Sequence, residues 1–522
     1  MSREGLVIND FSGGLNNVID PSLIADNEVS EIKNLGISRT GKLVSRHPIV
    51  KVGTYPTGTT TAQALGYYRN EDAVVFLVVA TNAKTWLYNL TANTWTEVWQ
   101  YAAEDIATYA NRLYLINSTN SGGYWSKISG TYTWTALNSG ANAMPNGNQI
   151  HFTKGRLYVS SRANGNRSTL RYSNLSSTAL GTSINEFPVA NAIDINEGDG
   201  DQLLKIVEGN SELFLFRSNS TYRLSFSASA EPSLGTLTVL SNTIGADSAR
   251  SVVEGENYLA ILHAGTLYQL AGYNFYPFNP ANKVEFQVKP NYAGIKQAVS
   301  KVGQYLLVWH HGYMYCYDTE TDLWVEWESV TEAAHFIEAP RGTFLDSAAV
   351  PTAYGVPGQN HATQGLLKLA LEFTATSEEL IKCSITTRTY DLGQPSLFKR
   401  MFGWELLLVA VNWVEASISP IDVINNPQMT WNDLDNYTWQ EAQENEIAWL
   451  PFGAAVPAIV GGLPTSNPNP QVVKVSGKQT FKRAYFTIKF ENDGTTATAP
   501  SRLDGIVLYL VNGRRIAMSR TA

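Results

Sequence analysis

The chain has little cysteine, little charge and no long apolar run. Its 522 residues contain two cysteines, Cys316 and Cys383, which are too few for a disulfide framework and favour synthesis in a reducing cytoplasm. The longest apolar runs, Ala73–Ala80 and Glu405–Val411, are too short to span a bilayer. The opening MSREGLVIND has no apolar signal segment. We therefore expect neither secretion nor a membrane segment.

A basic excess is also missing. Lys and Arg number 38 against 46 Asp and Glu, which gives a formal net charge of −8 and a pI near 5.5. A general nucleic-acid binder needs a basic surface to neutralise phosphates. The composition therefore excludes that class of protein.

The residues that are abundant favour short strands. The chain is 44% hydrophobic and 11% aromatic, with 40 Gly and 21 Pro. Such a composition suits many strands joined by tight turns rather than long helices. The sequence predicts an all-β protein with room for about three average domains, or fewer large ones.

An apolar strand core recurs through the first two thirds of the chain. Each copy follows a polar or glycine-containing turn, and the anchors of the six copies are Val75, Leu113, Leu157, Leu213, Leu259 and Leu306. The steps between them are 38, 44, 56, 46 and 47 residues, the longest containing an insertion at Ser183–Asp201. Since propeller blades repeat every 40 to 50 residues or so, the pattern predicts a β-propeller over residues 51–345.

Three of the repeats end in a strand that contains tryptophan. These are NLTANTWTEV, KISGTYTWTAL and YDTETDLWVEW, and each resembles the turn of a kelch blade. Because a four-stranded sheet cannot bury both faces alone, we expect Trp95, Trp134 and Trp324 to pack one blade on the next. The alternative is a β-sandwich with loosely spaced hairpins.

The two ends of the chain lack this repeat. Residues 346–522 predict a β-rich C-terminal region, with an excursion at 421–470 rich in Asn, Pro and Trp. Its strands could complete the propeller or form a separate sandwich. Residues 1–50 predict an arm made of a strand, a Gly-Gly turn and a helix from Ser22 to Leu35.

Two roles are open for this arm. It is either an assembly element that reaches a neighbouring molecule or a cap on its own propeller. The candidate assembly residues are Phe11, Gly13, Gly14, Leu15 and Pro21.

No motif predicts catalysis or metal binding. The stretch DINEGDGDQ departs from a calcium loop, because Gly198 and Lys205 stand where oxygen ligands are needed. His310 and His311 are adjacent on a strand, so they face opposite ways. SGTYTW lacks the acidic residue of a sialidase box, with Thr131 in its place. We expect no enzyme activity, no catalytic or metal-binding residue and no cofactor.

The opening segment Ile8–Ile49 resembles the start of tail proteins of short-tailed bacteriophages. The shared features are a strand, Phe-x-Gly-Gly-Leu-Asn, a Pro-led helix, an Asn and a Gly-x-Leu-x-x-Arg turn. The matching residues are Phe11, Gly13, Gly14, Leu15, Asn16, Pro21, Asn34, Gly41, Leu43 and Arg46. Two C-terminal stretches, TTRTYDLGQPSLFKRMFGWELLL and SRLDGIVLYLVNGRR, look like the same group.

The resemblance implies a tail nozzle, or tail tubular, protein. It implies a structural virion subunit, made in the host cytoplasm and assembled as a ring, most simply a hexamer, in the phage tail. Such a ring would form the distal channel through which viral double-stranded DNA is ejected, with non-specific and transient DNA contact. The implied protein partners are tail adaptor and fibre proteins.

Acidic residues are the candidates for a channel lining, because a lysine or arginine on a phosphate would add salt-dependent affinity and slow a moving duplex. The four candidates are Asp194, Glu197, Asp199 and Asp201. The alternative is a solvated loop outside the channel. Two other functions compete with the nozzle, namely a propeller enzyme that depolymerises host glycan and a cytoplasmic kelch-like interaction module.

The repeat pattern makes a prediction about stability. If Trp324 packs between blades, replacing it with alanine should lower the free energy of unfolding by roughly 3 to 5 kcal/mol, because a large buried ring leaves a cavity. Urea or thermal unfolding of the purified variant measures the change. An unchanged melt would place Trp324 on the surface.

Overall fold

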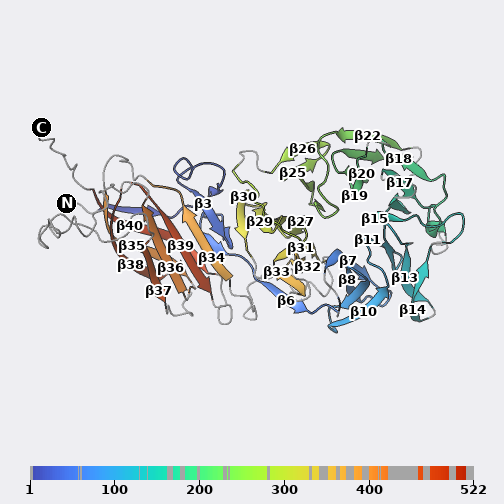
Figure 1. The fold of residues 1–522 in the computed structure, drawn as a ribbon, viewed down its shortest axis with the longest axis horizontal. Helices are drawn as coiled ribbons and strands as arrows, with labels where there is room; N and C mark the ends of the chain where they lie inside the picture. The colour runs from blue at the N-terminus through green and yellow to red at the C-terminus, as the bar shows by residue number, and fades with distance from the viewer. Residues whose placement is uncertain are drawn as a thin grey trace, which may run out of the picture.

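The computed structural model of the chain is all-β, with almost no helix in its described part apart from a 3-10 turn, η2 (Ser183–Asn185) (Figure 1). The structure describes residues 4–56, 58, 61–120, 122–128, 130–137, 139–161, 168–176, 183–196, 200–226, 232, 235–278, 283–328, 332–339, 351–359, 365–371, 381–390, 399–409, 411, 413–420, 456–461, 471–481, 483–492 and 501–512.

Short antiparallel sheets follow one another along the chain. The first consists of β7 (Ala62–Arg69), β8 (Val75–Thr81), β9 (Thr85–Asn89) and β10 (Thr94–Trp99). The second consists of β11 (Asp105–Tyr109), β12 (Arg112–Ile116), β13 (Gly123–Ile128) and β14 (Thr131–Ala136). The third consists of β15 (Gly147–Thr153), β16 (Arg156–Ser161), β17 (Thr169–Tyr172) and β18 (Ala192–Asp194).

Three further units have the same plan. The fourth consists of β19 (Leu203–Gly209), β20 (Glu212–Arg217), β21 (Thr221–Ser225) and β22 (Thr236–Ser241). The fifth consists of β23 (Val252–Glu254), β24 (Leu259–His263), β25 (Thr266–Ala271) and β26 (Asn274–Pro277). The sixth consists of β27 (Gln297–Val302), β28 (Tyr305–His310), β29 (Tyr313–Asp318) and β30 (Leu323–Trp327), within a larger sheet.

The predicted repeat of strand cores is confirmed. All six anchors are buried, and they lie on the second strands of these units: β8, β12, β16, β20, β24 and β28. Two-residue turns with positive φ join the hairpins, for example Asn210 and Ser211 between β19 and β20. Both central residues of such a turn are left-handed, which matches the natural twist of a hairpin.

A seventh four-stranded sheet joins distant parts of the chain. It consists of β31 (Ala333–Glu338), β32 (Thr352–Pro357), β33 (Leu366–Ala370) and β6 (Ile49–Gly53). Strand β6 pairs antiparallel with β33, although the two lie in opposite halves of the chain. The boundary expected at residue 345 lies between β31 and β32, which pair within this sheet.

The first strands of the seven sheets contact one another in succession. The contacts run β7–β11, β11–β15, β15–β19, β19–β23, β23–β27 and β27–β31, and β31 in turn contacts β7. Figure 1 shows the sheets following one another around the right-hand part of the molecule. Buried apolar clusters fill the spaces between neighbouring sheets, such as the one that joins Val78 and Leu87 to Leu113 and Leu115.

A six-stranded sheet and the continuation of the sheet that contains β30 form a second β body, on the left in Figure 1. One contains β1 (Glu4–Ile8), β4 (Leu35–Ile37), β5 (Leu43–Ser45), β35 (Lys399–Val409), β38 (Gln471–Phe481) and β40 (Arg502–Asn512). The other adds β2 (Gly14–Leu15), β3 (Glu28–Lys33), β34 (Ile381–Thr387), β36 (Trp413–Pro420), β37 (Val456–Gly461) and β39 (Ala484–Asn492) to the edge of β30. Trp404 of the first and Phe486 of the second lie 5.5 Å apart between ring centroids.

The predicted N-terminal helix from Ser22 to Leu35 is wrong. Residues 21–23 form a turn, and the later part of the segment supplies strand β3 and the start of β4. Strand β3 pairs with β34 on one side and meets β30 on the other, at Lys33 and Glu326. Pro21 suits the first turn of a helix, which favours a helix here, but ladder partners on both sides outweigh local propensity.

The excursion expected at 421–470 is described in one part only. Residues 456–461 form β37, which pairs antiparallel with β36. The remainder of that excursion lies outside the described residues.

Candidate functional site

The residues that carry the N-terminal resemblance build a turn packed on their own chain. Phe11 donates its backbone N–H to the carbonyl of Gly41 at 3.0 Å, and Gly14 donates its N–H to the carbonyl of Phe11 at 3.1 Å. Gly14 has a φ of 71°, in the left-handed region that favours glycine. A Cβ on Gly13 would lie 2.5 Å from the Glu28 side chain. The turn thus buries Phe11 and Leu15 in the core.

A buried acid fixes the next residue of this motif. Asn16 donates a side-chain N–H to Glu28 Oε2 at 2.9 Å, and the same oxygen accepts the backbone N–H of Ala25 at 3.0 Å. The other oxygen of Glu28 lies 2.7 Å from Lys283 Nζ, in the segment before β27. The Glu28 carboxylate therefore links the N-terminal segment to Lys283, in the segment that precedes β27.

Asn34 and Arg46 form the centre of a three-part joint. Asn34 Oδ1 accepts from Arg46 Nε at 2.8 Å and from the backbone N–H of Glu328 at 2.7 Å. Asn34 Nδ2 donates to the carbonyl of Lys382, on β34, at 2.8 Å. Arg46 also donates to the carbonyls of His47 and Glu328.

This joint is almost free of solvent, since Arg46 is 2% and Asn34 4% exposed. A buried guanidinium is costly unless its N–H groups find acceptors. Its acceptors come from the N-terminal segment and from the residue that follows β30, and Asn34 extends the network to β34. This hydrogen-bonded network therefore links the array of short sheets to the second β body, in addition to the pairing of β3 with β30.

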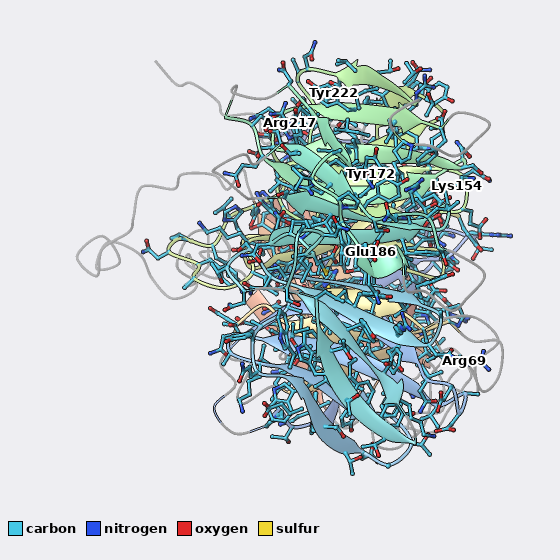
Figure 2. The ribbon with its side chains drawn as sticks, turned by 90° about the vertical axis from the view of Figure 1, so that its right-hand side faces the viewer. Arg69, Lys154, Tyr172, Glu186, Arg217 and Tyr222 are labelled. Atoms are coloured by element: carbon cyan, nitrogen blue, oxygen red, sulfur yellow. The ribbon has the colours of Figure 1, made fainter. Side chains whose placement is uncertain are left out.

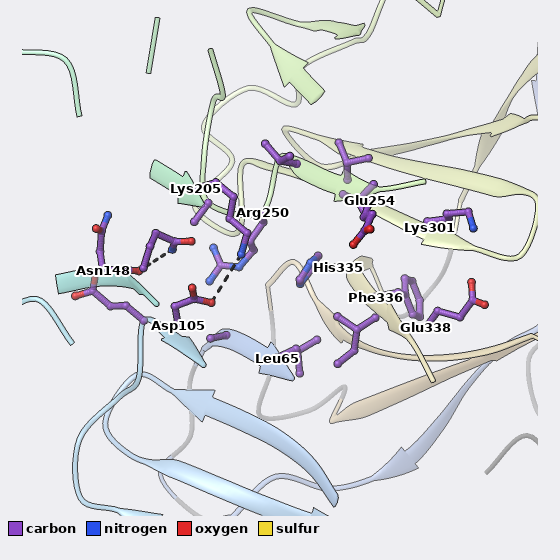
Figure 3. Close-up of a pocket in the computed structure, with 18 of the residues that line it drawn as sticks. Leu65, Asp105, Asn148, Lys205, Arg250, Glu254, Lys301, His335, Phe336 and Glu338 are labelled. Carbon is purple, nitrogen blue, oxygen red and sulfur yellow. Dashed lines mark hydrogen bonds and ion pairs between the residues drawn. The ribbon is translucent and has the colours of Figure 1, made fainter. Parts of the chain in front are cut away.

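A second feature is a cavity at the centre of the seven first strands. It has a volume of about 880 Å³, and each of the strands β7, β11, β15, β19, β23, β27 and β31 contributes lining residues. This volume is typical of small-molecule sites, which measure roughly 300–1,000 Å³. The cavity is shown in Figure 3.

One end of the cavity is rich in nitrogen donors. Lys205, Arg250 and His335 come from three different parts of the ring of sheets; Figure 3 shows Lys205 and Arg250 close together, with His335 between them and Glu254. Lys205 Nζ lies 3.8 Å from Asp105 Oδ1, while the second oxygen of Asp105 accepts the backbone N–H of Ile150 at 3.0 Å. We call this group, with Gln149 beside it, the cationic end.

Burial changes the titration of two of these groups. It lowers the pKa of Arg250 to about 10, which still leaves a cation at neutral pH. Burial, followed by the charges of Arg250 and Lys205, lowers the pKa of His335 to about 3. His335 is therefore a neutral imidazole at neutral pH, able to donate and accept hydrogen bonds.

The opposite end of the cavity carries Glu254, Lys301 and Glu338. Burial and the nearby charge of Glu208 raise the pKa of Glu254, against the opposing effect of Lys301. Glu338 Oε2 accepts the backbone N–H of Gly303 at 2.7 Å. We call this the acidic end, so the cavity has two ends of different character.

Asp194 and Asp201, two of the four channel-lining candidates, lie outside this cavity lining. Asp194 ends the outer strand β18 and accepts from Thr169 Oγ1 at 3.0 Å. Asp201 accepts from Ser220 Oγ at 2.7 Å and lies 3.7 Å from the buried Arg217 Nε, which Figure 2 labels beside Tyr222. Glu197 and Asp199 lie outside the described residues.

Trp95 and Trp134 lie at junctions between sheets, and Trp324 is buried in the largest core cluster. The ring centroids of Trp95 and Tyr88 lie 4.6 Å apart, and Trp95 also packs against an apolar cluster that includes residues of the seventh sheet. Trp134 stacks on Trp99 at 5.1 Å, between the first and second sheets. Trp324 is 4% exposed and lies between Tyr317 and Phe286.

Pro21, the remaining arm candidate, is exposed. Its carbonyl accepts the backbone N–H of Thr389 at 2.9 Å. The loop around it also exposes Val18, Ile19 and Leu23, the last by 75%.

The sequence alone does not indicate the cavity residues. Lys205, Arg250 and His335 are far apart in the chain and belong to no motif. The one local signal is a charged residue that follows apolar residues within a first strand, as Lys205 does after Leu203 and Leu204 in β19. A charged residue in a strand is equally typical of a solvent-exposed edge strand, so the sequence alone does not identify a cavity residue.

Two kinds of feature are absent from the part of the chain that the structure describes. No group of three or more His, Cys, Asp or Glu side chains is placed there to hold a metal ion. Within the same residues, no helix has both the length and the apolar character needed to cross a membrane.

No protein-family model and no curated protein matches the sequence. Many solved structures are similar to it in part, and three of them serve as examples. U3-55K has 9% identity and a TM-score of 0.41, and the match covers 62% of this chain and 98% of that one. The extracellular domain of a putative hybrid two-component system from B. thetaiotaomicron has 10% identity and a TM-score of 0.38, with 70% of this chain covered.

The third is PorZ, described as a surface component of the type-IX secretion system of Porphyromonas gingivalis. It has 9% identity and a TM-score of 0.38, with 67% of this chain covered. The matched part spans 44% of each of these last two structures. At such identities and TM-scores the similarities carry no argument about function.

The joint predicts a graded loss of stability at Asn34, whose φ is 58°. Asn34→Ala removes three side-chain hydrogen bonds and strains the backbone, so it should lower the free energy of unfolding by about 3 to 5 kcal/mol. Asn34→Gly should cost about 1 kcal/mol less, because glycine tolerates positive φ. Asn34→Asp, which keeps the acceptor for Arg46, is the control and should cost least. Urea unfolding gives the order, and equal stability of all three would contradict the joint.

The lowered pKa of His335 predicts that the folded protein loses stability in acid. Its pKa falls from an ordinary 6.5 to about 3 in the folded chain, so the unfolded chain binds the proton more tightly between these values. Stability should therefore be complete above pH 6.5 and decrease as the pH falls toward 3. His335→Gln, which cannot titrate, should flatten part of this acid limb when the melting temperature is measured from about pH 7 to about pH 4.5. An identical slope in the variant would show that His335 does not contribute.

Proposed function

We propose that the seven four-stranded units, six separate sheets and the β27–β30 part of the larger sheet, are the blades of a β-propeller. The support is the succession of contacts between first strands, which returns from β31 to β7. Strand β6 then supplies the outer strand of the last blade, which links the N-terminal part of the chain to the repeat. The three tryptophan-containing strands, β10, β14 and β30, are the fourth strands of their blades.

We propose further that the chain is a structural subunit of a bacteriophage tail, the nozzle, and not an enzyme. The observation that carries this proposal is the joint. Of the residues of the resemblance, Asn34 and Arg46 lie at the contact between blade and second β body, and Phe11, Gly14 and Gly41 shape the turn that leads to it. A subunit that must transmit force between two bodies needs such a contact.

Under this proposal the DNA passes through a channel enclosed by several copies of the subunit, and not through one subunit. A cavity of about 880 Å³ is of small-molecule size and does not admit a duplex. A ring of subunits, taken as a hexamer, would enclose the channel instead. The net charge of −8 recurs in every copy and would keep phosphates from binding.

The exposed loop around Pro21 is the proposed contact between copies. Val18, Ile19 and Leu23 are 44%, 47% and 75% exposed within one short stretch of chain. Adjacent exposed apolar side chains are typical of interaction surfaces. Tail adaptor and fibre proteins would bind elsewhere on the ring, and the assembled protein would reside in the virion tail.

The test has two parts. Mass measurement in solution should find a ring of identical subunits, and imaging of virions should place the protein at the distal tail. The double variant Ile19→Asp, Leu23→Asp should dissociate the ring without lowering the melting temperature of the subunit. Val239→Asp, at a similarly exposed site on β22, is the matched control and should leave the ring intact.

Two outcomes would refute the proposal. One is a protein that remains monomeric at all concentrations and is absent from virions. The other is release of sugar from host polysaccharide by the purified protein, which would favour the enzyme.

A further inference from the structure

The central cavity has the properties of a binding site rather than of a simple packing gap. It is lined from seven sheets, so its walls are fixed by the succession of strand contacts around it. Many of its lining residues are polar or charged, whereas a packing defect in a core is lined by apolar groups. Charged groups withdrawn from bulk water interact strongly with a polar ligand.

The cationic end has the geometry to hold a carboxylate. Lys205 and Arg250 lie close together in Figure 3, His335 follows them toward the middle of the cavity, and all three side chains carry N–H donors. One oxygen of Asp105, the acid next to Lys205, is already used by the backbone N–H of Ile150. Two cations and an imidazole arranged in this way suit the charge and the several acceptor sites of a carboxylate.

The neighbouring acid Glu104 is engaged away from this group. Its Oε1 accepts the backbone N–H of Ser118 at 3.1 Å and also the hydroxyl of Ser118. That carboxylate is thereby held at the loop after β12. The acid that faces Lys205 is therefore Asp105, and a ligand carboxylate would share these donors with it.

Gln149 supplies an independent indication of a ligand. Its side chain is 1% exposed and lines the cavity, and its Nε2 donates to the carbonyl of Asn148 at 2.6 Å. Its Oε1 is buried without a hydrogen-bond partner. Such an unsatisfied acceptor is costly, and a hydroxyl group of a ligand would satisfy it.

A ligand whose acid group lies at the cationic end must also carry hydrogen-bond donors that reach the acidic end. Glu254 and Glu338 present carboxylate oxygens, which accept hydrogen bonds when ionised. Glu254 lies on β23, whereas Arg250 lies in the turn before that strand, and Figure 3 shows the two side chains at different places along the cavity. A ligand that reaches from one end to the other is therefore larger than a phosphate ion and carries hydroxyls away from its acid.

We infer that the central cavity binds a small acidic saccharide, with its carboxylate between Lys205, Arg250 and His335 and its hydroxyls on Gln149, Glu254 and Glu338. A sugar acid combines the negative charge, the donors and the length that the two ends require. This site is separate from the joint and from the Pro21 loop, so it does not depend on assembly of a ring.

Titration calorimetry on the purified full chain tests the inference with four probes. D-glucuronate and N-acetylneuraminate represent the acidic saccharide, D-glucose a neutral one, and inorganic phosphate an anion without a sugar. The acids should bind at least about tenfold more tightly than glucose, because hydrogen bonds to charged groups are the stronger ones.

Matched variants locate the site. Lys205→Gln should weaken binding of the acidic probe by about tenfold, whereas Lys301→Gln, the same change at the other end of the cavity, should weaken it less than about threefold. Gln149→Leu removes the free acceptor without changing charge and should weaken both the acidic probe and glucose. It keeps the test usable if Lys205→Gln does not fold.

Four outcomes of these titrations would refute the inference. Equal binding of glucuronate and glucose would refute recognition of the acid. Phosphate binding as tight as glucuronate binding would reduce the site to an anion site and refute the saccharide. No measurable binding of any probe, or equal losses in Lys205→Gln and Lys301→Gln, would refute the assignment of the cationic end.

Discussion

The burial of Arg46 is the constraint on which the arrangement of the two β bodies depends. A guanidinium that is 2% exposed must have its N–H groups satisfied by protein acceptors, and these come from Asn34, His47 and Glu328. Asn34 in turn reaches β34 through the carbonyl of Lys382. Displacing either body would break these bonds around a buried charge, which typically costs several kcal/mol. The network therefore fixes the bodies relative to each other more firmly than apolar contact alone, which tolerates sliding.

The path of the N-terminal segment strengthens this coupling. Strands β3, β4 and β5 lie in the second body, and shortly after β5 ends at Ser45 the chain becomes part of β6, in the seventh sheet. The same short stretch thus completes both bodies. Separation of either body would require the loss of a sheet edge in the other, so unfolding of the two is expected to be coupled. This gives a physical reason for the glycine and asparagine residues of the opening motif, since the positive φ values of Gly14, Asn34 and Gly41 permit sharp turns within one small region.

The alternation of apolar and polar residues predicted most of the repeated hairpins. It did not predict the long-range pairing that completes the seventh sheet. Hairpins depend on alternation and turn residues close together in the sequence, so the cores at Leu113, Leu157 and Leu213 could be placed from the sequence. The seventh sheet takes β6 from the other end of the chain, and no local signal records such a pairing. Pro21 favours a helix from Ser22 to Leu35, whereas pairing of β3 with β34 decides the form of this segment. The cavity escaped prediction for the same reason, since its charged residues meet only when the seven sheets are arranged around it.

The ring of strand contacts also determines where each kind of chemistry can occur. First strands that meet around a common centre leave a space of small-molecule size, and the charged side chains on them are partly withdrawn from bulk water. Such charges act strongly over short distances and suit recognition of a small ligand. The outer surface has the opposite properties, because its charges are screened and its contacts spread over larger areas. Assembly with other copies, and any passage of nucleic acid, would therefore use the outside of the subunit, while the dimensions of the interior restrict it to ligands no larger than a few sugar rings.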